Sequence, residues 1–312
     1  MSEQHYDAQS FHDGLVVHGL IVPVGVPGAF GRGAVFEDVL ERFNALVSLV
    51  GADDRAESVT FPPIIDRRVL EKVRYVESFP HLCGVVHSFF GDAIQALALA
   101  ERASSGADWG DMLCQTGVVL NPACCYPLYP TLSGTLPANG RTVSLLGWAY
   151  RHEPSTDPTR MQSFRVREFI RAGSAEQVLE WRDLWLQRGI HLLVSLGLRT
   201  QTDIAADPFF GRRGKLLGAS QRELKLKFEV SAPIVSVEVL TALCSFNYHQ
   251  DRFGTDFDIR TVDGRVAHTA CLGFGMERVT MALFRAHGFV PDLWPTEVRK
   301  LLWPRVPRDH ET

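Results

Sequence analysis

The stretch GWAYRHEPSTDPTRMQSFRVREFI, residues 147–170, joins two segments of strand character through a polar, proline-containing loop. Residues 141–152 predict one strand, residues 154–159 a loop, and residues 161–170 a returning strand, so that the whole is a β-hairpin. Four arginines and three carboxylates lie within the quoted residues. Strands that only build a core do not carry this much charge, and the hairpin therefore predicts a binding site.

Alternation along the second strand separates its side chains between two faces. Phe164, Val166 and Glu168 share one face, together with Ile170, while Arg165 and Arg167 point the other way. An aromatic ring and a carboxylate are therefore expected on one surface.

The first strand and the loop add groups that suit a nucleotide. Arg151 and Glu153 are two residues apart and face the same side, and Arg160 lies in the loop. A guanidinium matches phosphate oxygens bidentately, while an aromatic ring such as that of Phe164 can stack on a base. These residues suit ATP, although the hairpin alone leaves open a solvated surface with cross-strand ion pairs.

The remaining elements indicate an α+β fold with a largely antiparallel sheet, because strands and helices follow without regular βαβ alternation. Strands are predicted at 15–24, 58–65, 225–234 and 235–248, helices at 34–50, 93–103 and 174–197, and a strand, a glycine break and a helix across 266–288. Segment 111–132 is too rich in proline for a regular helix. The helix at 34–50 is amphipathic, with one face formed by Val35, Val39, Phe43 and Val47.

The longest predicted helix has clear boundary signals. Ser174 with Gln177 forms a capping box at its start, and Gly197 can end it. We find no internal repeat, low-complexity tract or linker in the sequence, so we expect a single domain over residues 1–312.

Composition excludes several classes of protein. The 312 residues are 46% apolar with a net charge of −4, which suits an ordinary globular protein and gives no general positive field for DNA or RNA. No run approaches the roughly eighteen apolar residues of a membrane span, and the N-terminus does not resemble a signal peptide. We therefore expect a cytoplasmic protein whose six cysteines are mostly reduced.

A second binding signal is GFGMER at residues 273–278, where glycines separate a strand from a helix. Arg278 falls in the first turn of that helix, and both an arginine and a helix N-terminus favour anionic groups. Glycines at such a junction also serve close strand–helix packing, so this motif alone is weak.

Several motifs together resemble a known family. YRHE (150–153), TRMQSFRVREF (159–169) and CLGFGMERVTMAL (271–283) resemble motifs 2 and 3 of class II aminoacyl-tRNA synthetases, especially the zinc-dependent archaeal seryl enzymes. ACCYPLYP (123–130), DPFFGR (207–212), SFNYH (245–249) and AHTAC (267–271) resemble the small homologues called amino acid:carrier protein ligases. The resemblance runs from about Ala34 to the end and implies a class II synthetase-like catalytic domain, a mostly antiparallel sheet flanked by helices.

The resemblance assigns roles around ATP. It implies that Arg151 binds the α-phosphate and stabilises the charge that develops there, and that Glu153 meets the adenine amino group. Arg160 would reach the outer phosphates, Phe164 would stack on adenine, and Arg278 would cover the other face and contact the γ-phosphate. Magnesium is expected with the ATP, and Glu238 is a candidate ligand on a predicted strand, at an offset that differs from the seryl pattern.

The resemblance also implies one zinc ion per subunit, held by Cys125, Glu168 and Cys271, with an open coordination position for the amino group of the substrate. Without the resemblance, each cysteine is a small buried apolar residue. Cys124 is the alternative to Cys125. We choose Cys125 because it directly precedes YPLYP and because adjacent strand residues point to opposite faces.

Zinc that binds a free amine selects amino acids, and the shape of the pocket then selects the side chain. One methyl group changes binding by only about 1–3 kcal/mol, so glycine is the expected substrate and alanine the next. Ser245 and Asn247 are candidates for the pocket wall. Lys227 and Glu229 are either further wall residues or ordinary sheet residues.

The aminoacyl adenylate then needs an acceptor, either a tRNA hydroxyl or the phosphopantetheine thiol of a carrier protein. The chain reaches its first catalytic-type helix by about Ala34 and shows no heptad arm or basic tail, so we expect a carrier protein and no tRNA. The basic segment with Arg212, Arg213 and Lys215 is either a docking site for an acidic carrier protein or a solvated loop.

Two other functions stay open from the sequence. One is a true seryl-type aminoacyl-tRNA synthetase, and the other is a non-catalytic regulator that binds an amino acid. The presence of Arg151, Glu153, Arg278 and the three metal ligands speaks against the regulator, because a protein that only senses an amino acid does not need residues that bind phosphate. A homodimer that pairs through residues 58–65 is expected from the resemblance.

Overall fold

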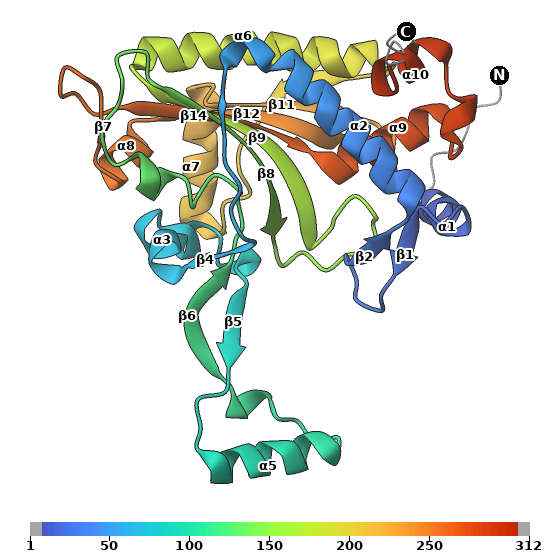
Figure 1. Ribbon diagram of the computed structural model, residues 1–312, viewed down its shortest axis with the longest axis vertical. Helices are drawn as coiled ribbons and strands as arrows, with labels where there is room; N and C mark the ends of the chain where they lie inside the picture. Colours follow the sequence, from blue (N-terminus) through green and yellow to red (C-terminus); the bar gives the residue numbers. More distant parts are fainter. Residues whose placement is uncertain (1–7, 305–312) are drawn as a thin grey trace, which may run out of the picture.

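A seven-stranded sheet forms the centre of the protein in the computed structural model, which describes residues 8–304 (Figure 1). Its strands lie in the order β10 (Gln201–Ile204), β11 (Lys227–Ala232), β12 (Thr241–Gln250), β14 (His268–Gly275), β9 (Ser163–Gly173), β8 (Arg141–Tyr150) and β3 (Glu57–Ser58). Neighbouring strands are antiparallel except β3 and β8, which are parallel. The predicted α+β class with a mainly antiparallel sheet is confirmed.

Helices cover one face of this sheet (Figure 1). They are α2 (Ala34–Val50), α6 (Ala175–Ser195) and α9 (Met276–His287), with α10 (Thr296–Leu302) packed on α2. Phe246, Leu272 and Phe169 are aligned across β12, β14 and β9 and are fully buried beneath these helices. The ring of Phe169 lies 4.6 Å from that of Trp185 of α6, centre to centre. This apolar layer leaves the opposite face of the sheet free for other chemistry.

Hairpin β8–β9 has the form that alternation predicted. Its ten residue pairs run from Arg141 opposite Ala172 to Tyr150 opposite Ser163, and residues 151–162 form the loop. Helix α6 also begins as predicted, because Ser174 and Gln177 form a capping box. Gly197 follows the helix with φ of 75°, a left-handed conformation in which glycine is favoured.

Helix α2 is confirmed, but its buried face is wider than the predicted one and also includes Phe36, Leu40 and Leu46. Val39, Phe43 and Val47 are buried as expected, whereas Val35 is 45% exposed. Phe36, which is 1% exposed, packs into the core in its place. Val35 lies in the first turn, where the following residue already points to the sheet.

The predicted strand at 15–24 is wrong over most of its length. Residues 8–17 form α1 (Ala8–Val17), and only β1 (Ile21–Pro23) is a strand, paired with β2 (Phe30–Arg32). Phe11 and Leu15 are four residues apart and both are buried, so one helical face packs on the core. Gly19 with φ of 65° then turns the chain into β1.

Two other predicted strands are shorter than expected. Residues 58–65 are split between β3 and β4 (Ile64–Asp66), because Pro62 and Pro63 lack the N–H that a strand needs. In segment 235–248 the strand begins only at Thr241. Before it, the Ser236 hydroxyl oxygen accepts hydrogen bonds from the backbone N–H groups of Glu238 and Val239, which favours a turn.

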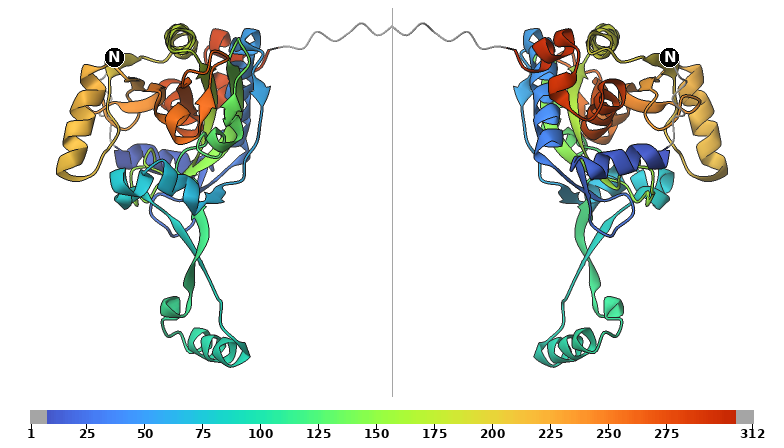
Figure 2. Two further views of the ribbon diagram at one scale, coloured as in Figure 1. Left: turned by 90° about the vertical axis from the view of Figure 1, so that its left-hand side faces the viewer. Right: turned by 90° about the vertical axis from the view of Figure 1, so that its right-hand side faces the viewer.

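An arm projects from the body (Figures 1 and 2). It consists of β5 (Val85–Ser88), α5 (Ala93–Ser104) and β6 (Cys114–Leu120), and β6 pairs with both β4 and β5 at its base. The predicted helix at 93–103 is confirmed, and Asp92 with Gln95 forms a capping box at its start, which was not predicted. Helix α5 has no buried residue, and Ile94 and Leu97 are 77% and 73% exposed.

The remaining elements lie around the free face of the sheet. They are α3 (Arg67–Lys72), α4 (Tyr75–Ser78), α7 (Gly211–Glu223), α8 (Arg252–Asp256), β7 (Gly134–Thr135) and β13 (Ile259–Arg260). A second apolar cluster forms here around the stacked rings of Tyr129 and Phe253. As expected, no α-helix occurs within 111–132, where β6 is followed by turns and a 3-10 helix at Tyr129–Leu132. Across residues 8–304 no helix is both long enough and apolar enough to span a bilayer.

Replacing Asp54 with alanine should lower the free energy of unfolding by about 3 kcal/mol, because a nearly buried carboxylate that accepts several hydrogen bonds is lost. Its oxygens accept from the indole N–H groups of Trp181 and Trp185 and from Arg188, at 2.8, 2.5 and 2.8 Å. Denaturant unfolding measures the change. Asp38→Ala is the matched control.

Asp38 also accepts from a tryptophan and an arginine, Trp303 and Arg42, but its side chain is 44% exposed. Its loss should cost less than about 1 kcal/mol, because water replaces the lost bonds. Equal effects of the two substitutions would contradict the role given to Asp54.

Candidate active site

A cavity of about 780 Å³ opens on the face of the sheet opposite α6. Residues of the four central strands β11, β12, β14 and β9 line one side, and α7 with the preceding segment lines another. The sequence-predicted residues that the structure brings to this cavity are Cys125, Arg151, Glu153, Phe164, Glu168, Lys227, Glu229, Ser245, Asn247, Cys271 and Arg278. One cavity therefore holds both the charged hairpin and the predicted metal ligands.

Strand register explains why residues far apart in the sequence meet here. One row across four strands consists of Glu168, Gly273, Ser245 and Glu229, and the adjacent row contains Cys271, Asn247 and Lys227. Residues directly opposite each other in antiparallel strands share a face. Since Glu168 lies on the cavity face, as alternation predicted, its whole row does too.

Cys125, Glu168 and Cys271 form a compact group. One ligand atom from each lies within 4.8 Å of those of the other two, and all three residues are buried. Cys125, and not Cys124, is the cysteine that the structure brings to this group. Strand alternation was the wrong reason for that choice, because residues 122–128 form bends and turns rather than a strand.

The electrostatics of this group favour a cation. Burial, and then the neighbouring Cys271, raises the pKa of Glu168 to about 8, and contact with the Cys271 thiol, with burial, raises the pKa of Cys125. The Oε2 atom of Glu168 is buried and has no hydrogen-bond partner. Two thiols and a carboxylate are ligands that zinc prefers, and a divalent cation would offset most of the negative charge of their ionised forms and occupy the unpaired oxygen. The donor set therefore fits zinc.

His249 stands next to this group and was missed from the sequence. Its Nε2 atom lies 3.5 Å from Cys271 Sγ, and its Nδ1 atom lies 3.0 Å from Thr269 Oγ1. Asn247 also contacts Cys271, since its Nδ2 donates to Sγ at 3.5 Å. Such partners orient a ligating side chain. The motif SFNYH contains His249, but only Ser245 and Asn247 were selected from it.

Two guanidiniums face the other part of the cavity. The Arg151 guanidinium carbon lies 5.6 Å from the centre of the Phe164 ring, and its Nε donates to the Pro122 carbonyl at 3.3 Å. Arg278 donates to the carbonyl oxygens of Thr159 and Ala242 at 2.9 and 3.2 Å. Burial, with the like charge of Arg151, lowers the pKa of Arg278. Two like charges facing one cavity indicate an anionic ligand.

Two predicted residues lie outside the residues that line the cavity. Arg160 is in the loop, with its side chain 60% exposed and an ion pair to Asp157 at 4.0 Å. Glu238 is exposed in the turn before β12, so its predicted place on a strand was wrong. Their roles with ATP and magnesium stay predictions. The side chains of Arg212 and Arg213 lie outside the described part of the chain, whereas Lys215 is exposed on α7.

The fold is the catalytic fold of class II aminoacyl-tRNA synthetases. M. kandleri SerRS, solved in complex with A. aeolicus tRNASec, superposes with a TM-score of 0.79 at 21% identity and covers 94% of this chain and 60% of that one. The prolyl-tRNA synthetase of Cryptosporidium parvum superposes with a TM-score of 0.66 at 13% identity, over 90% of this chain and 52% of that one. No protein-family model matches the chain.

Sequence similarity is more specific than the fold. The chain is 43% identical over 281 residues to amino acid–[acyl-carrier-protein] ligase 2 of Bradyrhizobium diazoefficiens, over 89% of this chain and 84% of that protein. Ligase 1 of the same organism is 39% identical over 89% of this chain and 86% of that protein. The type-2 serine–tRNA ligase of Methanopyrus kandleri is 27% identical, and the chain spans 50% of its length. The protein belongs to the amino acid–acyl-carrier-protein ligase family, as the sequence motifs predicted.

Proposed function

We propose that the protein activates a small amino acid with ATP, glycine first and alanine next, and transfers it to the phosphopantetheine thiol of a carrier protein. The observation that carries this proposal is the shared cavity, in which Cys125, Glu168 and Cys271 lie on the same sheet face as Arg151 and Arg278. A carboxylate oxygen of the amino acid attacks the α-phosphorus of ATP, and the bond to pyrophosphate breaks. The thiol then attacks the carbonyl carbon of the adenylate, and AMP leaves.

The nucleotide is held by the hairpin and by the start of α9. Arg151 binds the α-phosphate, and Arg278 contacts the γ-phosphate, because planar guanidiniums match phosphate oxygens. Phe164 stacks on the adenine, and Glu153 accepts from its exocyclic amine. Arg160 reaches the outer phosphates from the loop. Magnesium supplies counter-charge to the phosphates, with Glu238 as a candidate ligand.

The amino acid lies at the other end of the cavity. Zinc held by Cys125, Glu168 and Cys271 would supply a Lewis-acid position for a free amino group. Ser245 and Asn247 are next to this group in the sheet and form the wall of the side-chain pocket. Since one methyl group changes binding by only about 1–3 kcal/mol, alanine is a poorer substrate than glycine but not an excluded one.

The carrier protein is the acceptor by family membership, since the names of both bacterial relatives include acyl-carrier protein. Carrier proteins are acidic, and α7, with the exposed Lys215 and with Arg212 and Arg213 in its sequence, lies beside the cavity. We assign the docking of the carrier protein to this helix. The protein also forms a homodimer through residues 58–65.

Amino-acid-dependent exchange of pyrophosphate into ATP tests the first half of the proposal. All twenty amino acids are compared, and we expect exchange with glycine above exchange with alanine and no exchange without an amino acid. The second half is tested by the transfer of labelled glycine to a phosphopantetheinylated carrier protein. The carrier protein without phosphopantetheine is the control, and total tRNA is tested as the alternative acceptor. Acid-stable label on tRNA alone, or exchange with serine alone, would contradict the proposal.

A further inference from the structure

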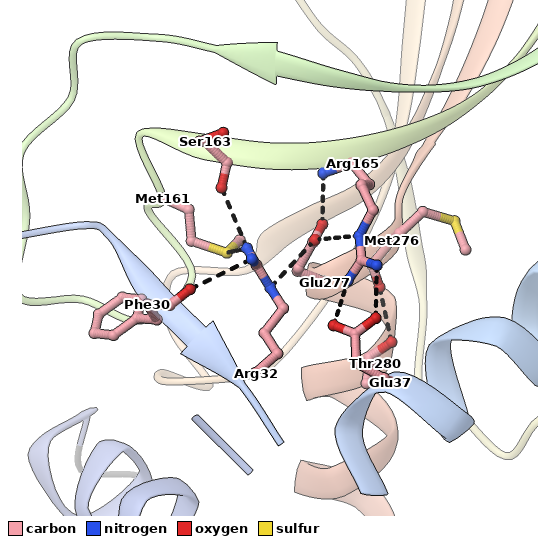
Figure 3. A network of polar contacts seen from close by, with 9 residues as sticks. All are labelled: Phe30, Arg32, Glu37, Met161, Ser163, Arg165, Met276, Glu277 and Thr280. Atoms are coloured by element: carbon pink, nitrogen blue, oxygen red, sulfur yellow. Dashed lines mark hydrogen bonds and ion pairs between the residues drawn. The ribbon is translucent and has the colours of Figure 1, made fainter. Parts of the chain in front are cut away.

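A network of two arginines and two glutamates links β2, α2, β9 and α9 (Figure 3). Its centre is Glu277, which is 0% exposed in the first turn of α9. The carboxylate accepts from the Arg165 backbone N–H at 2.8 Å and from Arg165 Nε at 2.9 Å, and it pairs with Arg32 Nε at 3.3 Å. Figure 3 shows Glu277 between the two guanidiniums.

The network is balanced in charge. Arg165 donates from its two terminal nitrogens to both carboxylate oxygens of Glu37, at 2.6 and 2.8 Å. The guanidiniums of Arg165 and Arg32 both lie over the Trp148 ring, 5.1 and 5.3 Å from its centre. Two like charges stay close because a carboxylate lies between them. The network therefore fixes its members in one arrangement.

Two members of the network, Glu277 and Arg165, adjoin residues of the proposed nucleotide site in the sequence. Glu277 precedes Arg278, and Arg165 follows Phe164. Arg32 donates to the carbonyl oxygen of Ser163 at 3.2 Å, at the first residue of β9. Neighbouring residues on a strand point to opposite faces of the sheet. The bonds that Arg165 makes on the helix-covered face therefore limit the movement of the Phe164 ring on the cavity face.

We propose that Glu277, with Arg32 and Arg165, is a positioning residue for the nucleotide, and this inference rests on the function proposed above. The network ties the start of β9 to the first turn of α9 and to the first turn of α2, where Glu37 lies. It thereby holds Phe164 and Arg278 at the separation that a bound nucleotide needs. A buried polar set holds one geometry only when every member is paired, which is the case for Glu277.

The position of the network within the sheet predicts that its loss affects only one end of the cavity. Its contacts on β9 are at Ser163 and Arg165, whereas the metal group begins at Glu168, three residues further along the strand. Loss of the network should therefore disturb the nucleotide end of the cavity and leave the amino acid end in place. A merely structural role would affect both ends equally.

The test is Glu277→Gln, which removes the charge and keeps the size of the side chain. We expect the dissociation constant of magnesium-ATP, measured by titration calorimetry, to rise about tenfold, because small displacements of positioning groups have effects of this order. The KM for glycine in pyrophosphate exchange should change less than about twofold, and the zinc content should stay that of the parent protein. Thermal unfolding of the same samples reports the folded fraction.

Arg32→Lys is a second variant, in case Glu277→Gln does not fold. It keeps the charge but lacks the fork that reaches both Glu277 and Ser163, and it should weaken ATP binding in the same direction. Glu71→Gln is the matched control, because Glu71 pairs with Arg67 at 3.0 Å on the exposed face of α3. This control should leave the dissociation constant of magnesium-ATP and the KM for glycine unchanged.

The outcomes separate this inference from the proposed function. Weaker ATP binding in Glu277→Gln with an unchanged KM for glycine supports the positioning role. Folded variants with unchanged ATP binding, or with equal losses for both substrates, overturn it. If the parent protein binds ATP but catalyses no exchange, the proposed function fails, while the ATP titration of the variants still decides the positioning role. A parent protein that binds no ATP overturns both.

Discussion

If the protein works as proposed, replacing Cys271 with serine should abolish zinc binding and lower glycine-dependent pyrophosphate exchange by at least about 100-fold, since even outer partners of metal ligands change activity by 10–100-fold. A serine hydroxyl remains protonated near neutral pH and is a poor ligand for zinc, whereas a thiolate is a strong one. Cys271 lies on the central strand β14 and is 7% exposed. Metal analysis of the purified variant gives zinc per chain, independently of activity.

Cys124→Ser is the matched control for this prediction. Cys124 is buried, as Cys125 is, and precedes it directly in the sequence, but it is not a member of the compact group. The control should keep both its zinc and its exchange activity. If Cys124→Ser lost zinc and Cys271→Ser kept it, the ligand set would have to be assigned again around Cys124.

Removal of the metal should also leave ATP binding largely intact. Arg151 and Phe164 are held by the hairpin and by contacts with the loop and Pro122, none of which includes a thiol. Magnesium-ATP titrated into Cys271→Ser should therefore bind within about threefold of the parent protein, because sites without shared partners contribute independently. Complete loss of ATP binding would show that the two ends of the cavity fold as one unit.

The hairpin could be predicted from the sequence because its signals are local. Strand alternation over residues 161–170 placed Phe164 and Glu168 on one face without knowledge of any other strand. The capping box of Ser174 and Gln177 likewise depends on four residues alone. Predictions of this kind are confirmed because the tertiary structure favours the same conformation as the local sequence.

The metal group could not be derived from spacing. Cys125 lies in a turn, Glu168 on β9 and Cys271 on β14. The register of the β9–β14 pair, in which Glu168 lies opposite Gly273, brings Glu168 close to Cys271. That pairing is a long-range property, so family resemblance supplied what composition and periodicity could not. His249 was missed for the same reason, since it meets Cys271 only across the β12–β14 pair.

The errors have a common physical cause. Segment 15–24 is rich in β-branched residues, but Phe11 and Leu15 bury the face of a helix that begins before it. Glu238 falls in segment 235–248, which was predicted as a strand, although the Ser236 hydroxyl accepts from the Glu238 backbone N–H and stabilises a turn there. Local propensity is a weak guide where a side chain can satisfy the backbone in another way.

Replacing Arg151 with alanine should lower kcat for adenylate formation by about 100- to 1,000-fold, because one preorganised group that stabilises developing charge has this effect. Negative charge grows on the α-phosphate oxygens as the carboxylate attacks, and the Arg151 guanidinium faces the cavity beside Phe164. Arg151→Lys keeps the charge but loses the planar fork, and it should recover only part of the loss. Single-turnover formation of labelled adenylate measures the step directly.

Arg141→Ala is the control, at the other end of β8. Arg141 begins β8, whereas Arg151 directly follows its end, and Arg141 pairs with Glu57 away from the cavity. Its loss should leave kcat unchanged within about twofold, as for an ordinary surface ion pair. Arg151→Ala should keep its full zinc content, so a fall in rate without a fall in zinc separates phosphate chemistry from the metal group. Full activity in Arg151→Ala would place the stabilising charge elsewhere, and Arg278, which also lines the cavity, would be the residue to replace next.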